Sequence, residues 1–175
     1  LSQSDYGVSL LNDCKYGGDV HGKTVRLTLL KGSIHPDPDA DLGTHHFTYE
    51  LYPHAGDWRT ARTDRAALEL NCPPVFHHAA GREAGLVRCD APNLTLEAVK
   101  RGEPDLASAD ALILRLVEQD NARTPATLRF DRAVSKAWTC DLNETPEQEL
   151  ETAGDAVALT ARPCEILTLR VEFAD

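Results

Sequence analysis

The sequence contains no methionine, and residue 1 is Leu, so we expect the chain to be an excised fragment or a processed piece of a longer protein. It has no apolar run near the roughly 20 residues that span a bilayer, and no signal-peptide pattern opens it. Basic residues are too few to balance acidic ones: 18 Lys and Arg against 28 Asp and Glu give a net charge of −10. That charge repels phosphate backbones and anionic lipids, which argues against nucleic acid and membrane surfaces as partners.

Metal-binding and redox cysteine motifs are absent as well. The five cysteines lie far apart and no C-x-x-C pair occurs, which excludes a zinc knuckle or a dithiol redox motif. Cysteines scattered in this way usually pack as small apolar residues in a reducing compartment, so we expect a cytoplasmic protein. Two N-x-T sequons, at Asn93 and Asn143, are short patterns that arise by chance and change that expectation little.

Familiar catalytic patterns are missing too. The chain has no G-x-S-x-G elbow, P-loop, G-x-G-x-x-G or H-E-x-x-H motif. Histidines gather along residues 35–54, but His45 and His46 would point to opposite faces of a strand, so they cannot share a metal ion. A zinc site needs three or four convergent ligands, and no spacing here supplies them. We therefore expect no catalytic residue, no metal site and no cofactor in this chain.

The acidic stretch HPDPDADLGTHH begins like a calcium-binding loop, with Asp37, Asp39 and Asp41 at alternate positions. Such a loop needs Gly at its sixth position and Glu at its twelfth, where this chain has Leu42 and Thr48. Two better interpretations remain open: a solvated acidic hairpin loop, or a polar loop that reaches into a sugar site.

A period of two dominates the rest of the chain. Apolar residues alternate with polar ones in short runs cut by Gly, Pro, Asn and Asp, which is typical of half-buried antiparallel strands. The runs lie at residues 24–30, 46–52, 93–99, 111–118, 126–131 and 165–173. They predict an all-β fold made of antiparallel β-sandwiches.

One segment departs from this pattern. Residues 57–70 lack Gly and Pro, and Asp57 is a suitable N-cap, so the segment predicts one short helix; a helical excursion between two strands is the alternative. Small and polar residues with two glycines follow at 77–85 and indicate a domain boundary. We expect a first domain at about residues 1–80 and a second, compact β-sandwich at about residues 83–175.

The stretch GVSLLNDCKYGGDV, together with several later pieces, resembles the family 38 glycoside hydrolases, the α-mannosidases. The likeness is to the branch that contains the bacterial and cytosolic enzymes. The matching pieces follow the family's order and spacing, at residues 7–20, 26–31, 37–43, 45–49, 53–56, 111–130 and 162–173. The resemblance therefore extends over almost the whole chain.

The resemblance implies a parent enzyme that hydrolyses α-mannosides with zinc and with retention of configuration. In the family, an N-terminal α/β domain supplies the nucleophile and the zinc site, and C-terminal β-domains buttress it and lend loops to the pocket. This chain would then be a non-catalytic C-terminal part, with residues 1–80 closing a galactose-mutarotase-like supersandwich. Its implied partners are its own N-terminal catalytic domain and mannose-containing glycans. Because the first sandwich would be incomplete, we also expect association between copies.

The candidate sugar contacts are polar residues in two loops. They are Asn12, Asp13, Lys15, Tyr16, Asp37, Asp39, Asp41 and His45. Amide, carboxylate and ammonium groups bind vicinal hydroxyls, and a tyrosine ring offers a stacking face. The alternative is that Asn12 and Asp13 only form a tight turn and that Lys15 is solvated. The rival functions are a stand-alone carbohydrate-binding module and a structural interaction domain.

Overall fold

The computed structural model describes residues 1–76, 85–103 and 111–174. The chain divides into two compact units, Leu1–His78 and Ala79–Asp175, each with its own sheets. The predicted boundary segment at 77–85 lies outside the described residues, except for Gly85.

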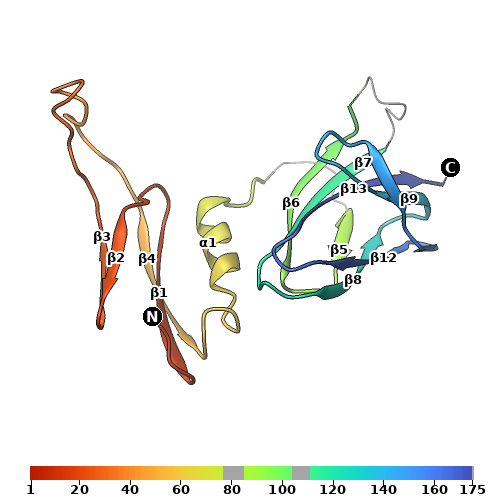
Figure 1. Ribbon diagram of the computed structural model, residues 1–175, viewed down its shortest axis with the longest axis horizontal. Helices are drawn as coiled ribbons and strands as arrows, with labels where there is room; N and C mark the ends of the chain where they lie inside the picture. Colours follow the sequence, from red (N-terminus) through yellow and green to blue (C-terminus); the bar gives the residue numbers. More distant parts are fainter. Residues whose placement is uncertain (77–84, 104–110, 175) are drawn as a thin grey trace. The chain divides into compact units, whose positions relative to one another are not determined.

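The first unit consists of two antiparallel ribbons and one helix (Figure 1). Strand β1 pairs with β4, and β2 pairs with β3. Helix α1 packs on one face of the β1–β4 ribbon, where Ser9 Oγ lies 3.1 Å from both His54 Nε2 and Thr63 Oγ1. The elements are β1 (Tyr6–Asn12), β2 (Gly18–His21), β3 (Thr24–Leu27), β4 (Tyr49–Ala55) and α1 (Thr63–Asn71).

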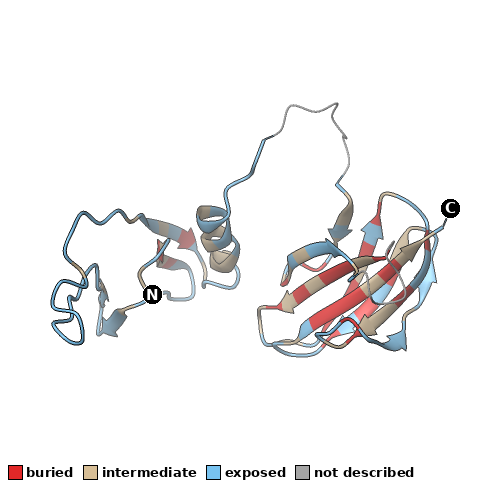
Figure 2. Cartoon of the chain, turned by 90° about the horizontal axis from the view of Figure 1, so that it is seen from above, coloured by how far each residue is buried: buried red, intermediate tan, exposed pale blue. Residues whose placement is uncertain are grey.

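The second unit is an antiparallel β-sandwich. One sheet has the strand order β10-β9-β13-β7-β6, and the other has the order β11-β12-β8-β5. Buried side chains from both sheets, such as Leu114, Leu169, Leu128 and Val157, form one core between them, and Figure 2 shows it as red bands along the strands. The strands are β5 (Val87–Cys89), β6 (Leu94–Arg101), β7 (Leu112–Glu118), β8 (Thr124–Phe130), β9 (Val134–Cys140), β10 (Pro146–Glu149), β11 (Thr152–Ala153), β12 (Ala156–Ala161) and β13 (Ile166–Phe173).

The structure confirms the predicted fold class, since the chain is mainly antiparallel strands with one short helix. Four of the alternating runs correspond to β6, β7, β8 and β13. The run at 24–30 forms a strand only as far as Leu27, and the run at 46–52 only from Tyr49. The residues between these two strands form the acidic loop, which carries four of the eight predicted sugar contacts.

The predicted start of the helix is wrong, because α1 begins at Thr63 and not next to Asp57. Asp57 does close a turn, since its Oδ1 accepts the N–H of Thr60 at 2.8 Å. Arg62 then adopts left-handed dihedral angles (φ 52°, ψ 46°), which interrupt the helical path before Thr63.

A buried carboxylate ties several segments of the sandwich together. Glu118, the last residue of β7, is only 2% exposed. Burial raises the pKa of Glu118, but four hydrogen-bond donors lower it by more, so the pKa lies below the ordinary glutamate value. The four donors, at 2.7–3.1 Å, are the backbone N–H groups of Asp120, Ala122 and Cys164 and the side-chain amide of Asn93. The second amide hydrogen of Asn93 is donated to Thr124 Oγ1 at 2.6 Å.

Candidate functional site

The polar stretch that ends β1 forms a turn fastened to the segment before β4. Asn12 Oδ1 accepts the backbone N–H of Lys15 at 2.5 Å, which closes the turn. Asp13 N–H donates to Thr48 O at 3.2 Å, and Thr48 N–H donates to Asp13 Oδ2 at 3.0 Å. Because β1 and β4 are paired as far as Asn12 and Tyr49, Asp13 and Thr48 occupy the next positions in the register. The turn is therefore an extension of the β1–β4 ribbon.

Hydrogen bonds also set the charges in this turn. The N–H of Thr48 is the main cause that lowers the pKa of Asp13, and the thiol of Cys14 lowers it further. The same contact raises the pKa of Cys14, because the thiol proton is held by the neighbouring carboxylate. At neutral pH, the turn therefore carries an ionised Asp13 beside a neutral thiol.

The turn forms one wall of a groove of about 380 Å³. The groove is lined by residues 14–17, by residues 28–31 after β3 and by Asp41 of the acidic loop. Gly17 O accepts the N–H of Thr28 at 2.8 Å, which holds the first two walls together. A side chain at Gly17 would press on Thr28, since an added Cβ would lie 3.1 Å from Thr28 Cβ. Glycine therefore lets the two walls approach without displacing Thr28.

Three of the predicted sugar contacts meet at this groove. Lys15 is half-buried, and its Nζ lies 5.0 Å from the centroid of the Phe47 ring. The Tyr16 side chain is fully exposed. Asp41 is half-buried and lies beside Gly32, where an added Cβ would be 3.8 Å from Asp41 Oδ2. The groove thus offers an ammonium, a carboxylate and an aromatic ring, which suit a ligand with several hydroxyl groups.

The other predicted sugar contacts do not line the groove; these are Asn12, Asp13, Asp37, Asp39 and His45. Asp37 Oδ1 accepts the N–H of Asp39 at 2.9 Å, and His45 Nε2 donates to the backbone O of Asp41 at 2.9 Å. These two bonds hold the acidic loop in shape. Within the described parts of the chain, no three His, Cys, Asp or Glu side chains are grouped so as to hold a metal ion.

Sequence reasoning missed several residues that build the groove. The alternating run at 46–52 predicts Phe47 as a strand residue, whereas it precedes β4 and its ring lies 5.0 Å from Lys15 Nζ. Lys31 lies within a matched motif, yet no pattern identified it as a groove residue. Both residues lie in pieces that resemble the family, at 26–31 and 45–49, but the resemblance assigned neither of them a role.

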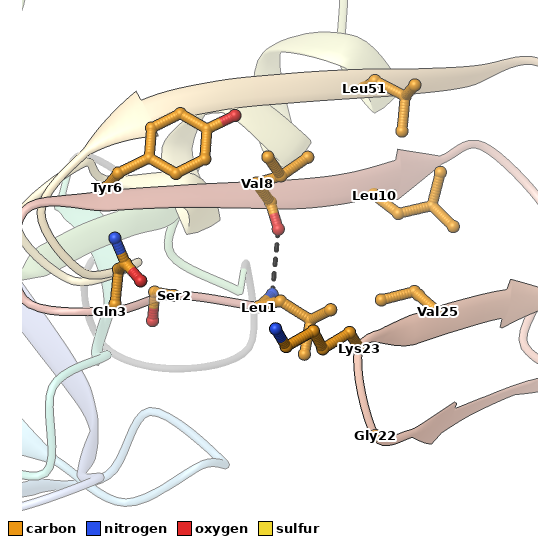
Figure 3. Close-up of a pocket in the computed structure, with 10 residues that line it drawn as sticks. All are labelled: Leu1, Ser2, Gln3, Tyr6, Val8, Leu10, Gly22, Lys23, Val25 and Leu51. Atoms are coloured by element: carbon orange, nitrogen blue, oxygen red, sulfur yellow. Dashed lines mark hydrogen bonds between the residues drawn. The ribbon is translucent and has the colours of Figure 1, made fainter.

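A second hollow, of about 640 Å³, lies on the face of the β1–β4 ribbon that is turned away from α1 (Figure 3). Because side chains alternate along a strand, Ser9 faces the helix and its neighbours Val8 and Leu10 face the hollow. The side chains of Leu51 and Tyr6 are 66% and 50% exposed. An exposed apolar face of this kind is a candidate contact surface. We define the open apolar face as Tyr6, Val8, Leu10, Val25 and Leu51.

Two family models match the chain. The glycosyl hydrolases family 38 C-terminal beta sandwich domain matches residues 93–169, and the glycosyl hydrolases family 38 C-terminal domain matches residues 1–39. The groove residues Lys15 and Tyr16 lie in the second match, and most of the sandwich lies in the first.

The chain is also similar to several curated α-mannosidases. Alpha-mannosidase 2C1 from Homo sapiens is 35% identical over 175 residues, which cover 97% of this chain and 17% of that protein. Alpha-mannosidase from Saccharomyces cerevisiae is 30% identical over 196 residues, which cover 98% of this chain and 18% of that protein. This chain thus spans less than a fifth of the length of these relatives. In the described residues, no helix has the length and apolar character needed to cross a membrane.

Proposed function

Since this chain belongs to the C-terminal region of the family 38 glycosyl hydrolases, we propose that it is the non-catalytic β region of a longer α-mannosidase. In this role it buttresses the catalytic domain and lends polar loops to the sugar pocket. The observation that carries the proposal is the groove at which Lys15, Tyr16 and Asp41 converge from two loops. A pocket for a neutral sugar needs such a mixture of donors, acceptors and a stacking surface.

The groove residues would bind and orient the substrate. The Lys15 ammonium donates hydrogen bonds to sugar hydroxyls, Asp41 accepts them, and the Tyr16 ring stacks on the apolar side of the sugar. Hydrolysis with retention needs one carboxylate as nucleophile and a second carboxyl group as acid and then base. We place both in the rest of the polypeptide. We propose that the zinc site lies there too; among the described residues of this chain, no three His, Cys, Asp or Glu side chains are grouped so as to hold a metal ion.

The open apolar face supports the proposal that this chain buttresses the catalytic domain. Leu51 on β4 and Tyr6 on β1 would be costly to leave in water, since each buried apolar side chain contributes roughly 1.5–3 kcal/mol. We propose that the rest of the α-mannosidase polypeptide, including its catalytic domain, covers this face. The complete protein would act on mannose-containing glycans in the cytoplasm.

A stand-alone carbohydrate-binding module is the second candidate, and one observation favours it. The Tyr16 ring is fully exposed beside the groove, as aromatic rings of sugar-binding modules are. The two candidates differ in what this chain does by itself. A module would bind mannosides without any other part of the polypeptide, whereas a pocket rim would bind them only together with the catalytic domain.

The chain alone is expected to have no α-mannosidase activity, because the proposed nucleophile and zinc site lie outside it. The measurement is hydrolysis of an activated aryl α-mannoside by the purified chain with added zinc. The complete polypeptide serves as the positive control, and the complete polypeptide without its nucleophile sets the background. Turnover by the chain above that background would disprove the proposal that the nucleophile and the zinc site lie outside it.

The chain alone is also expected to associate with itself through the open apolar face. Replacing Leu51 by Lys should shift the protein toward the monomer, because it places a charge on this face. Leu142→Lys is the matched control, since Leu142 is 65% exposed and Leu51 is 66% exposed. Sedimentation velocity over a range of concentrations measures the effect. A wild-type chain that stays monomeric at high concentration, or equal effects of the two substitutions, would contradict the prediction.

A further inference from the structure

We propose that Phe47 is a positioning residue that holds the Lys15 ammonium at the groove; this inference rests on the proposed role of Lys15 as a sugar contact. Lys15 Nζ lies 5.0 Å from the centroid of the Phe47 ring, within the roughly 6 Å over which a cation is attracted to an aromatic face. Both side chains are half-buried. The contact joins the turn after β1, which carries Lys15, to the segment before β4, which carries Phe47.

The backbone on both sides of this contact is fixed. The N–H of Lys15 is bonded to Asn12 Oδ1 at 2.5 Å, which sets the direction in which its side chain leaves the turn. Thr48, next to Phe47, exchanges two hydrogen bonds with Asp13. The ring and the ammonium therefore come from two segments that are tied together close to the contact. Their approach follows from the β1–β4 register and does not depend on two unrestrained side chains meeting.

An aromatic ring is suited to this task because it attracts the ammonium without occupying its N–H donors as a carboxylate would. Among the described residues, no carboxylate lies within ion-pair distance of Lys15. An unsupported lysine side chain samples many rotamers, and fixing them on binding lowers affinity. Phe47 restricts these rotamers before the sugar arrives and leaves the donors directed at hydroxyl groups. It acts through Lys15 and does not touch the sugar itself.

The test is a double-mutant cycle in the complete α-mannosidase polypeptide that carries this chain. Phe47→Leu keeps an apolar side chain without the ring, and it should lower kcat/KM for an aryl α-mannoside about two- to fivefold, mainly through KM. Phe47→Tyr retains the ring and should stay within about twofold of the wild type. In a Lys15→Met background, Phe47→Leu should have no further effect, because no charge remains for the ring to hold. Phe76→Leu is the control, since Phe76 is 88% exposed.

Three outcomes would overturn the inference, and they separate it from the proposed function. If Lys15→Met leaves kcat/KM unchanged, the sugar contact itself is wrong and the inference fails with it. If Lys15→Met lowers kcat/KM but Phe47→Leu does not, only the positioning role is wrong. If Phe47→Leu lowers kcat/KM by the same factor with and without the lysine, Phe47 supports the loop and does not position the ammonium.

Discussion

Replacing Glu118 by Ala is expected to lower the free energy of unfolding of the second unit by about 3–5 kcal/mol. The substitution leaves four donors without their acceptor, three of them backbone N–H groups from two loops. A hydrogen bond to a charged group contributes about 1.5–3 kcal/mol, and water that enters the vacated space offsets part of the summed loss. Denaturant unfolding can be followed at Trp138 in a Trp58→Phe background, since each unit contains one of the two tryptophans.

Glu118→Gln tests whether stability depends on the charge of this side chain, and Glu149→Ala is the control at an exposed position. Glu118→Gln keeps one acceptor oxygen but turns an amide toward the donors, so we expect a loss of about 1–3 kcal/mol. Glu149→Ala removes an exposed glutamate of β10 and should change stability by less than about 0.5 kcal/mol. If Glu118→Ala is no more damaging than Glu149→Ala, the carboxylate does not organise the sandwich.

The same site predicts a dependence on pH with a definite sign. Because the pKa of Glu118 is lower in the folded state than in the unfolded chain, its ionised form stabilises the fold fully above the ordinary glutamate pKa, about 4.3. This contribution is lost as the pH falls through the lower, folded-state pKa. The free energy of unfolding of the wild type should therefore fall more steeply in acid than that of Glu118→Gln. Parallel curves for the two proteins would count against the prediction.

In the complete α-mannosidase polypeptide proposed above, Asp41→Ala and Lys15→Ala are expected to lower kcat/KM roughly three- to a hundredfold. A neutral hydrogen bond lost from a desolvated sugar site costs roughly 0.5–1.5 kcal/mol, and one to a charged group such as Asp41 or Lys15 costs about 1.5–3 kcal/mol. Asp13→Ala is expected to fall in the same range. Its carboxylate accepts the Thr48 N–H, so part of that loss comes through the turn. Loss of the catalytic nucleophile would be more severe by several further orders of magnitude.

Stability must be measured alongside activity for each of these variants. Asp39→Ala is an informative comparison, because Asp39 belongs to the same acidic loop but does not line the groove. We expect a larger loss for Asp41→Ala than for Asp39→Ala. Full activity in the Asp41 and Lys15 variants, or activity lost only in step with the melting temperature, would show that both loops are scaffold.

The fold class was predictable because alternation is strong in the long central strands. In β13, buried Leu167, Leu169 and Val171 alternate with polar residues, so the period of two is visible without neighbours. β10, Pro146–Glu149, has four exposed residues and no alternation; its pairing with β9 creates the strand. The left-handed conformation of Arg62 likewise has no local signal, since nothing in its residue type requires it.

The sequence predicted the polar residues of the candidate site, but it did not predict which of them line the groove. The polar residues after β1 and in the acidic loop stand out in the sequence, yet of the acidic loop only Asp41 lines the groove. That selection depends on how the loop folds over the segment after β3, which is a tertiary effect. The contact between Phe47 and Lys15 depends on the β1–β4 register, which places Thr48 opposite Asp13. A one-residue change in that register would turn Phe47 to the other side.

The amide of Asn93 belongs to the sequon Asn93-Leu94-Thr95. An N-linked glycan replaces one of the two amide hydrogens by a bond to sugar. In this fold both hydrogens are in use, one toward Glu118 and the other toward Thr124. A glycan would remove one of these bonds and force a bulky group into a part-buried site. A compartment that glycosylates nascent chains would therefore act against the folding of this sandwich, in agreement with the proposal that the protein is made and works in the cytoplasm.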